Sequence, residues 1–385
     1  MAIRLLGPND PAVEALQPLL SKNPDLDAQI EIVRWEDYYT TLLESLKSNP
    51  CPFQAIFIPG HVWLDSLIHT GLVVPLPLDE VDAAVVTDYC LHDILPSVRK
   101  ECSRAGELYL VPWFSDGHIC FFHADVADLF NGTTTPIIRP TQLIDVARKA
   151  HRPPERYGIA LKAAVSEMFL DWLPFLWDFG GELLDGDLHP VFTTPQAVES
   201  LEAYIALKSY CPPDVHTYGN LEIGRVLKEN RVSMATTWGG QASAIFGSAV
   251  ESSNVVPYRA GVYAQPWNAT WGIGLPAHQP QSTRRSVAEW LLRIANQQMD
   301  EYILRVAGSP VRISTYSSQN FQRYFWLPAQ WEMLQRCRTL PFTHKLSDIL
   351  GVMYPTVYAA FIGEKSARKA LADAESTILQ LLRNR

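Results

Sequence analysis

Phe53-Gln-Ala-Ile-Phe-Ile58, closed by Pro59-Gly60, has the composition of a buried β-strand, and we expect a helix after it, over His61–Leu72. Two similar units come before it in the chain. The strand-like segments Ala2-Ile-Arg-Leu-Leu6 and Gln29-Ile-Glu-Ile-Val-Arg34 are each followed by apolar residues at helical spacing. Three strand–helix units in succession predict a parallel sheet with helices on both faces.

Beyond this region the pattern of elements changes twice. Glu107–Trp113 and His118–Phe122 predict two extended segments around a polar turn at Ser115-Asp116-Gly117. A second α/β region is expected from Ala124 to Val256. After it the sequence predicts a strand at Trp271–Leu275 and a mainly helical tail from Phe321 to Arg385.

Length and composition indicate a folded protein of two to three domains. The chain has 385 residues, of which 47% are hydrophobic and 19% charged. A net charge of −9 without any Lys/Arg-rich run argues against binding to a nucleic-acid backbone. No apolar stretch is long enough for a membrane-spanning helix. The six cysteines are scattered without a C-x-x-C pair, so neither a zinc site nor a dense disulfide framework is expected.

The first ten residues contain no long apolar region of the kind found in export signals. Two interpretations remain open. Either the protein never had a signal, or Met1 stands where a signal was removed.

Five segments, in order, resemble the family 1 extracellular solute-binding proteins of ABC importers, the maltose-binding-like group. They are Trp35-Glu-Asp-Tyr38; Leu110–Asp116 through Phe122–Asp125; Phe179–Asp185 with Thr194–Leu201; Leu227–Ala235 ending in Trp238-Gly239; and Gly308-Ser-Pro-Val-Arg312. Each segment is degenerate alone, but five in this order are specific, and the resemblance covers nearly the whole chain.

The resemblance implies an α/β, two-lobed periplasmic-binding-protein-like fold of type II. Each lobe would be a mostly parallel sheet flanked by helices, built from discontinuous chain and joined to the other by hinge strands. One lobe would comprise 1–111 plus 264–311, and the other 112–263 plus 312–385. The ligand would lie in the cleft between the lobes, outside the carboxyl ends of the strands, and binding would close the cleft.

Residues at strand ends are therefore the candidates for ligand binding. They are Asn9, Asp10, Trp35, Glu36, His61, Trp63, Trp113, Phe114, Asp116, Glu167, Trp177, Trp238, Gly239, Trp267, Trp271 and Arg312. Flat aromatic rings together with Asp, Glu and Asn suit a sugar, which presents a C–H face and a rim of hydroxyls. A single Arg312 is little support for an anionic ligand, although helix N-termini can also bind anions.

Several candidates also have an ordinary structural interpretation. Trp35, Trp113, Trp238 and Trp271 fit the cleft or the core about equally, whereas Trp172, Trp290, Trp326 and Trp331 lie in helical patterns and are assigned to packing. Asp10 can cap a helix, Asp116 can form a turn, Glu167 can be a solvated helix residue, and Arg312 can pair with an acid.

The sequence lacks the common motifs of enzymatic and metal chemistry. The chain has no G-x-S-x-G, Walker or H-E-x-x-H motif. Gly272–Ala277 matches G-x-G-x-x-A, but no helix follows it to hold a pyrophosphate. Asp185-Gly-Asp187 lacks the spaced ligands of a calcium loop and predicts a hairpin turn. We expect neither a metal nor a cofactor.

The sequence thus predicts a monomeric binding protein that captures a carbohydrate, an oligosaccharide or glycoside, and delivers it to an ABC permease. The expected location is periplasmic or extracytoplasmic, with a cytoplasmic location as the alternative. The competing function is a sugar-active enzyme that uses paired carboxylates such as Asp116 and Glu167.

Overall fold

The computed structural model describes residues 2–22, 26–251 and 256–383. The chain divides into two compact units. The first comprises Met1–Asp116, Ala269–Asn320 and Phe342–His344, and the second comprises Gly117–Asn268, Phe321–Pro341 and Lys345–Arg385. These boundaries assign 112–116, 312–320 and 342–344 to the first unit and 264–268 to the second, whereas the predicted lobes place each of these segments in the other part. The ends of those lobes at Met1 and Arg385 lie outside the described residues.

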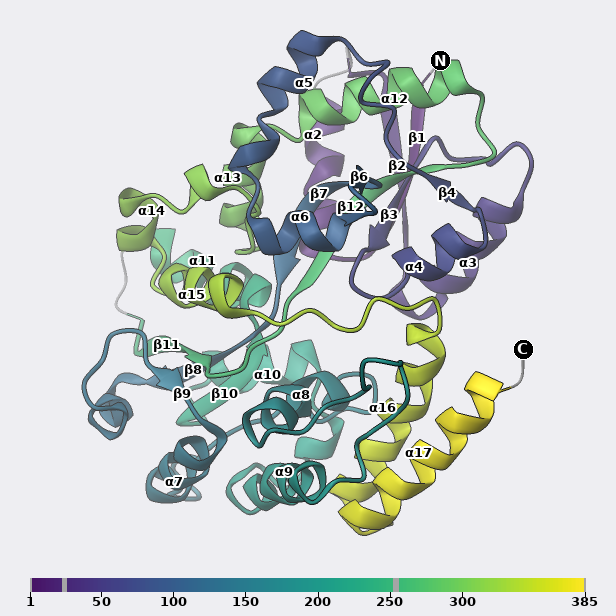
Figure 1. Cartoon of the computed structure of the whole chain (residues 1–385). Coiled ribbons are helices and arrows are strands. Elements are labelled where there is room, and N and C mark those ends of the chain that lie inside the picture. Colours follow the sequence, from purple (N-terminus) through teal and green to yellow (C-terminus); the bar gives the residue numbers. More distant parts are fainter. Residues whose placement is uncertain (1, 23–25, 252–255, 384–385) are drawn as a thin grey trace. The chain divides into compact units, whose positions relative to one another are not determined.

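The first unit is built on a six-stranded sheet of order β2-β1-β3-β12-β4, with β7 pairing to β12. The strands are β1 (Ile3–Pro8), β2 (Ala28–Val33), β3 (Ala55–Pro59), β4 (Val73–Val74), β7 (Leu110–Asp116) and β12 (Ala269–Pro276). The pairings of β1 with β2 and with β3 are parallel, as predicted. β12 runs antiparallel to β3, β4 and β7, and in Figure 1 this green strand lies among the purple and blue strands.

The helices of the first unit mostly follow the strands in the predicted alternation. They are α1 (Pro11–Glu14), α2 (Leu16–Lys22), α3 (Trp35–Lys47), α4 (Leu64–His69), α5 (Ala83–Tyr89), α6 (Pro96–Cys102), α12 (Gln281–Ile294) and α13 (Gln297–Val306), with α14 (Ser318–Arg323) at the passage into the second unit. The core contains Leu5, Leu6, Ile56, Phe57 and Ile58, all with no exposed surface. A separate two-stranded ribbon joins β5 (Ser103–Arg104) to β6 (Glu107–Leu108).

The second unit contains a four-stranded sheet of order β10-β8-β11-β9. Its strands are β8 (His118–His123), β9 (Ile137–Ile138), β10 (Met234–Trp238) and β11 (Tyr258–Tyr263). Its helices are α7 (Pro140–Ala150), α8 (Met168–Asp178), α9 (Pro195–Ala206), α10 (Asn220–Lys228), α11 (Ala242–Glu251), α15 (Leu327–Arg336), α16 (Leu346–Ile362) and α17 (Ala367–Arg383). β8 pairs antiparallel with both β10 and β11, whereas β11 pairs parallel with β9, so one strand of this sheet runs against the other three.

The polar segment Ser115-Asp116-Gly117 does not form the predicted turn between two paired strands. β7 ends at Asp116 in the first unit's sheet, and β8 begins at His118 in the second unit's sheet. The return passage follows Asn268, and Ala269 pairs with Asp116. A Cβ at Gly117 would clash with the carbonyl oxygen of Trp267, so this passage requires glycine.

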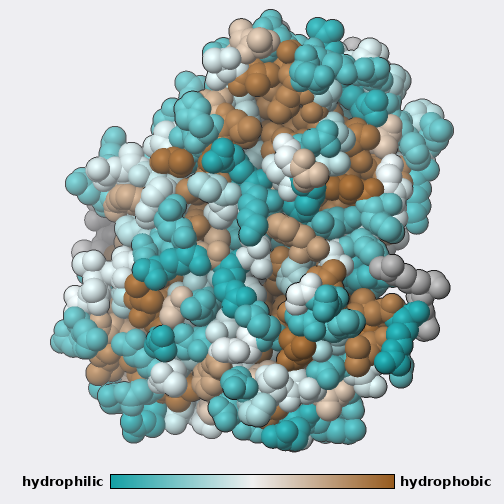
Figure 2. All heavy atoms as spheres, in the orientation of Figure 1, coloured by the Kyte–Doolittle hydropathy of each residue, from teal (hydrophilic) through white to brown (hydrophobic). Residues whose placement is uncertain are grey.

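The face shown in Figure 2 carries hydrophilic and hydrophobic residues interspersed. Among the described residues, no helix combines the length and the apolar character that crossing a membrane requires.

Thr270 lies in β12, just after the chain returns to the first unit. Its N–H, its carbonyl and its hydroxyl all take part in hydrogen bonds. Its N–H donates to Glu101 Oε2 (2.8 Å), and its carbonyl accepts from Gly60 N (2.8 Å). His61 Nδ1 lies 3.3 Å from the same carbonyl, and the Thr270 hydroxyl lies 2.9 Å from Ser115 Oγ. Glu101 is fully buried, and burial raises its pKa to about 8.

Replacing Glu101 with Gln is expected to remove part of the pH dependence of stability. The pKa of Glu101 in the folded protein lies above the ordinary value of a glutamate. The contribution of the protonated side chain to the free energy of unfolding is therefore complete below the ordinary pKa and is lost as the pH rises towards about 8. In urea unfolding, wild type should lose at least roughly 1 kcal/mol relative to Glu101→Gln between about pH 5 and about pH 9.

The comparison isolates Glu101, because the other buried groups with shifted pKa values are present in both proteins. Burial raises the pKa values of Asp10 and Asp300 to about 6 and lowers that of His61 to about 4. Glu107→Gln, on an exposed residue nearby, should behave as wild type. Parallel pH profiles of wild type and Glu101→Gln would contradict the prediction.

Candidate functional site

Four aromatic side chains of the first unit form what we call the tryptophan cluster: Trp35, Trp63, Trp271 and Phe114. Trp35 stacks on Trp63 with ring centroids 5.9 Å apart and an interplanar angle of 8°. Trp271 meets Trp35 edge-on at 5.8 Å and stacks on Phe114 at 5.9 Å. Trp35 follows β2 and Trp63 follows β3, so the ends of these two parallel strands place the two rings in one patch.

The tryptophan cluster is open to solvent at Trp35, whose side chain is 48% exposed. Asn9, which follows β1, holds this residue because its Oδ1 accepts a hydrogen bond from Trp35 N at 2.8 Å. Glu36 is exposed in the first turn of α3. Asp10 caps α1 by accepting from Ala12 N at 2.8 Å, which is the structural role considered for it.

The second unit brings Lys162, Glu167, Asn220 and Trp238 together in what we call the lysine cluster. Lys162 is fully buried, and its Nζ lies 2.9 Å from Glu167 Oε2 and 2.6 Å from Asn220 Oδ1. Trp238 Nε1 donates to Glu167 Oε2 at 3.3 Å, while Lys162 Nζ lies 4.9 Å from the centre of the Trp238 ring. The half-buried indole is thus fixed by a hydrogen bond at its edge and a cation at its face.

Each member of the lysine cluster is placed by an adjacent element. Trp238 ends β10, Glu167 occupies the N-cap position of α8, and Asn220 opens α10. Lys162 follows Ala160, which bridges in parallel to Ala235 of β10.

Asp171, in α8, is a fully buried carboxylate behind the lysine cluster. Its Oδ1 lies 2.8 Å from His118 Nδ1. Its Oδ2 accepts from Tyr204 Oη (2.9 Å), Thr236 Oγ1 (3.0 Å) and Lys162 N (3.2 Å). This network ties α8 to β8, β10 and α9, and it holds the backbone from which the Lys162 side chain projects.

Three predicted ligand-binding tryptophans are instead packing residues. Trp113 is 1% exposed, donates to Ala12 O and packs edge-on against Phe57. Trp267 is fully buried and donates to Leu170 O. Trp177 is 5% exposed and lies beneath the guanidinium of Arg338 at 4.4 Å. These rings are held by partners of their own units, so we remove them from the candidate site.

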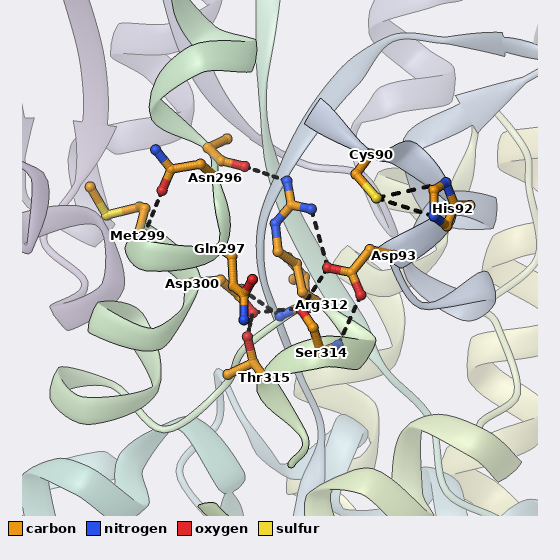
Figure 3. A network of polar contacts seen from close by, with 12 residues as sticks. Cys90, His92, Asp93, Asn296, Gln297, Met299, Asp300, Arg312, Ser314 and Thr315 are labelled. Carbon is orange, nitrogen blue, oxygen red and sulfur yellow. Dashed lines mark hydrogen bonds and ion pairs between the residues drawn. The ribbon is translucent and has the colours of Figure 1, made fainter. Parts of the chain in front are cut away.

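Arg312 is likewise a structural residue. Figure 3 shows it between two elements of the first unit: its guanidinium donates to Ala295 O at 2.5 Å and lies 3.4 Å from Asp93 Oδ2. Its backbone N–H donates to Asp300 Oδ2 at 3.0 Å. The side chain is nearly fully buried and lies over the Tyr89 ring, so the predicted alternative of pairing with an acid is the one observed.

The remaining candidates are also buried in their own units. His61 bonds to the Thr270 carbonyl, as described above. Asp116 is 6% exposed at the end of β7. Gly239 is buried, and its N–H donates to Gly117 O at 3.0 Å. Trp172 and Trp326 have no exposed surface, which confirms their assignment to packing.

Sequence reasoning missed Lys162, Asn220, His118 and Asp171. A signal was present for Lys162, since a lysine directly after the apolar run Gly158–Leu161 is unusual at the end of a buried strand. No comparable signal marks the other three, because their roles depend on side chains brought together from distant segments.

Asp185, Asp187 and His189 are the residues of the described chain whose ligand atoms lie close enough together to hold a metal ion. All three are exposed. Asp185 Oδ1 accepts from the N–H groups of Asp187 and His189, and Asp185 N donates to His189 O, so the predicted hairpin turn accounts for the group.

Two units built from interleaved segments, each with an α/β sheet and clustered strand-end side chains, define a two-lobed solute-binding fold. The family model for "bacterial extracellular solute-binding protein" matches residues 8–298, and the chain belongs to this family. The members that this family description covers are solute-binding proteins.

Known proteins similar to this chain include sugar and polyol binders. The mannitol-binding protein of Pseudomonas aeruginosa is 25% identical over 322 residues, which cover 75% of this chain and 73% of that protein. An ABC transporter solute-binding protein from Agrobacterium radiobacter in complex with ribitol superposes with a TM-score of 0.85 at 18% identity, covering 99% and 98% of the two chains. A maltose-bound protein of T. maritima gives a TM-score of 0.82 at 16% identity, covering 99% of each chain.

Proposed function

We propose that this protein captures an uncharged carbohydrate and delivers it unchanged to an ABC permease outside the cytoplasmic membrane. The observation that supports this most is that each unit presents partly exposed indole rings beside hydrogen-bonding side chains, Trp35 in one and Trp238 in the other. An indole stacks on the C–H face of a sugar, and neighbouring carboxylate and amide groups bond to its hydroxyls.

The charges in the two clusters favour a neutral ligand. Lys162, the cation of the lysine cluster, is already paired with Glu167, and Arg312, which lies outside both clusters, is engaged with Asp93 and Ala295 O. An anionic solute that bound to either cation would have to displace its partner, at a substantial desolvation cost. Neutral polyhydroxy compounds require no such displacement.

The proposed ligands are sugars and sugar alcohols. The sequence favoured an oligosaccharide or glycoside, while the similar proteins bind mannitol, ribitol and maltose. We propose that the protein acts as a monomer and makes or breaks no bond in its ligand. In support, Glu167 is held by both Lys162 and Trp238, which leaves it poorly placed to transfer a proton.

A panel of D-mannitol, ribitol, maltose and glycerol 3-phosphate tests the proposal by thermal shift and calorimetry. At least one uncharged compound should raise the melting temperature and be recovered unchanged after prolonged incubation. Stabilisation by glycerol 3-phosphate alone, or the appearance of a cleaved product, would overturn it.

Trp35→Ala is expected to weaken carbohydrate binding about tenfold, roughly 1.4 kcal/mol, because it removes the open ring of the tryptophan cluster. The free energy of unfolding should change by no more than about 1 kcal/mol, since this side chain is 48% exposed. Ile313→Ala, on another exposed apolar residue of the first unit, is the matched control and should leave affinity unchanged. Calorimetric titration of both variants with D-mannitol and maltose checks the prediction.

A further inference from the structure

His118 is a buried histidine with one ring nitrogen bonded and the other not. It is the first residue of β8 and its side chain has no exposed surface. Nδ1 lies 2.8 Å from Asp171 Oδ1, whereas Nε2 has no hydrogen-bonding partner among the described residues. A buried polar atom left in this state costs roughly 1–3 kcal/mol, so it calls for an explanation.

The partners of Asp171 determine which nitrogen of His118 carries the hydrogen. A carboxylate can only accept hydrogen bonds, and Asp171 already accepts from Tyr204, Thr236 and the backbone of Lys162. Nδ1 must therefore donate to Asp171. Burial lowers the pKa of His118, which favours the neutral ring. In a neutral ring with the hydrogen on Nδ1, Nε2 is a bare acceptor.

The bare acceptor lies on a ring that packs directly against the lysine cluster. The His118 ring meets Trp238 at a centroid distance of 4.7 Å and an interplanar angle of 87°, and it meets Trp267 at 5.4 Å. Trp267 donates its N–H to Leu170 O, and Trp238 donates its N–H to Glu167. Neither indole N–H thus serves Nε2, so a donor for it has to come from water or from a hydroxyl or N–H of a bound molecule.

We propose that His118 Nε2 accepts a hydrogen bond from a hydroxyl of the bound carbohydrate. The inference depends on the proposed function and adds a specificity-determining residue to it. Asp171 acts behind His118 as a positioning residue, since it fixes the ring and the position of its hydrogen. The arrangement selects ligands that offer a hydroxyl at this point and rejects analogues in which that hydroxyl is deleted or methylated, because Nε2 is then left unsatisfied.

The first test reads the tautomer in the wild-type protein without ligand. Nitrogen NMR of protein labelled with ¹⁵N-histidine, with the His118 signals assigned by comparison with His118→Asn, should show hydrogen on Nδ1 and none on Nε2. Addition of D-mannitol or maltose should shift the Nε2 resonance as it becomes a hydrogen-bond acceptor. A hydrogen found on Nε2 would overturn the inference.

The second test separates the two ring nitrogens by substitution. The Asn side-chain amide can replace Nδ1–H towards Asp171 but supplies nothing at the position of Nε2, whereas Gln reaches that position. His118→Asn should lose at least about tenfold in affinity for the panel compound that wild type binds, and His118→Gln should recover part of the loss.

The outcomes also separate this inference from the proposed function. If wild type binds the panel compound and a folded His118→Asn binds it equally well, only the role of His118 falls. If wild type binds no carbohydrate, the proposed function is wrong, and a hydrogen bond from a carbohydrate hydroxyl to His118 Nε2 is excluded as well. Should His118→Asn fail to fold, His118→Gln serves for the assignment, and the response of the wild-type Nε2 resonance to ligand decides.

Discussion

Trp238→Ala is expected to weaken carbohydrate binding by about 100-fold, roughly 2.7 kcal/mol, the largest effect on affinity among the substitutions considered. The indole is oriented by Glu167 through Nε1 and by Lys162 at its face, so its position is fixed before ligand arrives. Its removal eliminates the stacking surface of the second unit and leaves Glu167 with one partner fewer. Calorimetric titration with the compound found in the panel measures the change.

Some loss of stability should accompany this substitution. Trp238 packs against His118 and Trp267, so the free energy of unfolding should fall by about 1–3 kcal/mol rather than remain unchanged. Trp331→Ala in α15 is the matched control, a half-buried tryptophan of the same unit that lies outside the lysine cluster. A large loss of melting temperature with unaltered affinity for Trp238→Ala would assign this ring to the core.

Asp171→Ala is expected to destabilise the second unit by roughly 3–5 kcal/mol. The substitution deprives His118, Tyr204, Thr236 and the Lys162 N–H of their common acceptor in a region without exposed surface. In urea unfolding monitored by tryptophan fluorescence, the transition of this unit should move to lower denaturant concentration.

Asp348→Ala serves as the control, because Asp348 is an exposed aspartate of α16 whose nearest cation, Lys345, is 3.9 Å away. Its effect should stay within about 0.5 kcal/mol. Equal, small effects of both substitutions would show that the Asp171 network contributes little to folding.

Much of the fold could be predicted from local patterns. The alternation of apolar runs and helical spacing over 2–72 marks β1 to β3 and their helices, because these elements pair with neighbours close in sequence. β12 could be recognised as a strand but not placed, since its position between β3 and β7 depends on pairing across more than 150 residues. The antiparallel pairing of β8 was missed for the same reason.

The candidate site was predicted less completely. Strand-end position selected Trp35 and Trp63, whose rings stack where the carboxyl ends of the parallel strands β2 and β3 share one edge of the sheet. Trp271 joins them from near the amino end of the antiparallel strand β12. The same rule also selected Trp113 and Trp267, whose rings are buried, because position along a strand does not say which face a side chain occupies. The roles of Lys162 and Glu167 depend on the ion pair between them, and no local sequence pattern predicts that pair.

The interleaving of the two units has a consequence for how the chain is made. A ribosome releases β1, β2 and β3 early, but the neighbour that covers the free edge of β3 is β12, at 269–276. The second unit in turn awaits α15, α16 and α17, at 327–383. Neither unit can finish folding until nearly all of the polypeptide has been synthesised, so a nascent chain keeps an unpaired strand edge that a holding chaperone could cover.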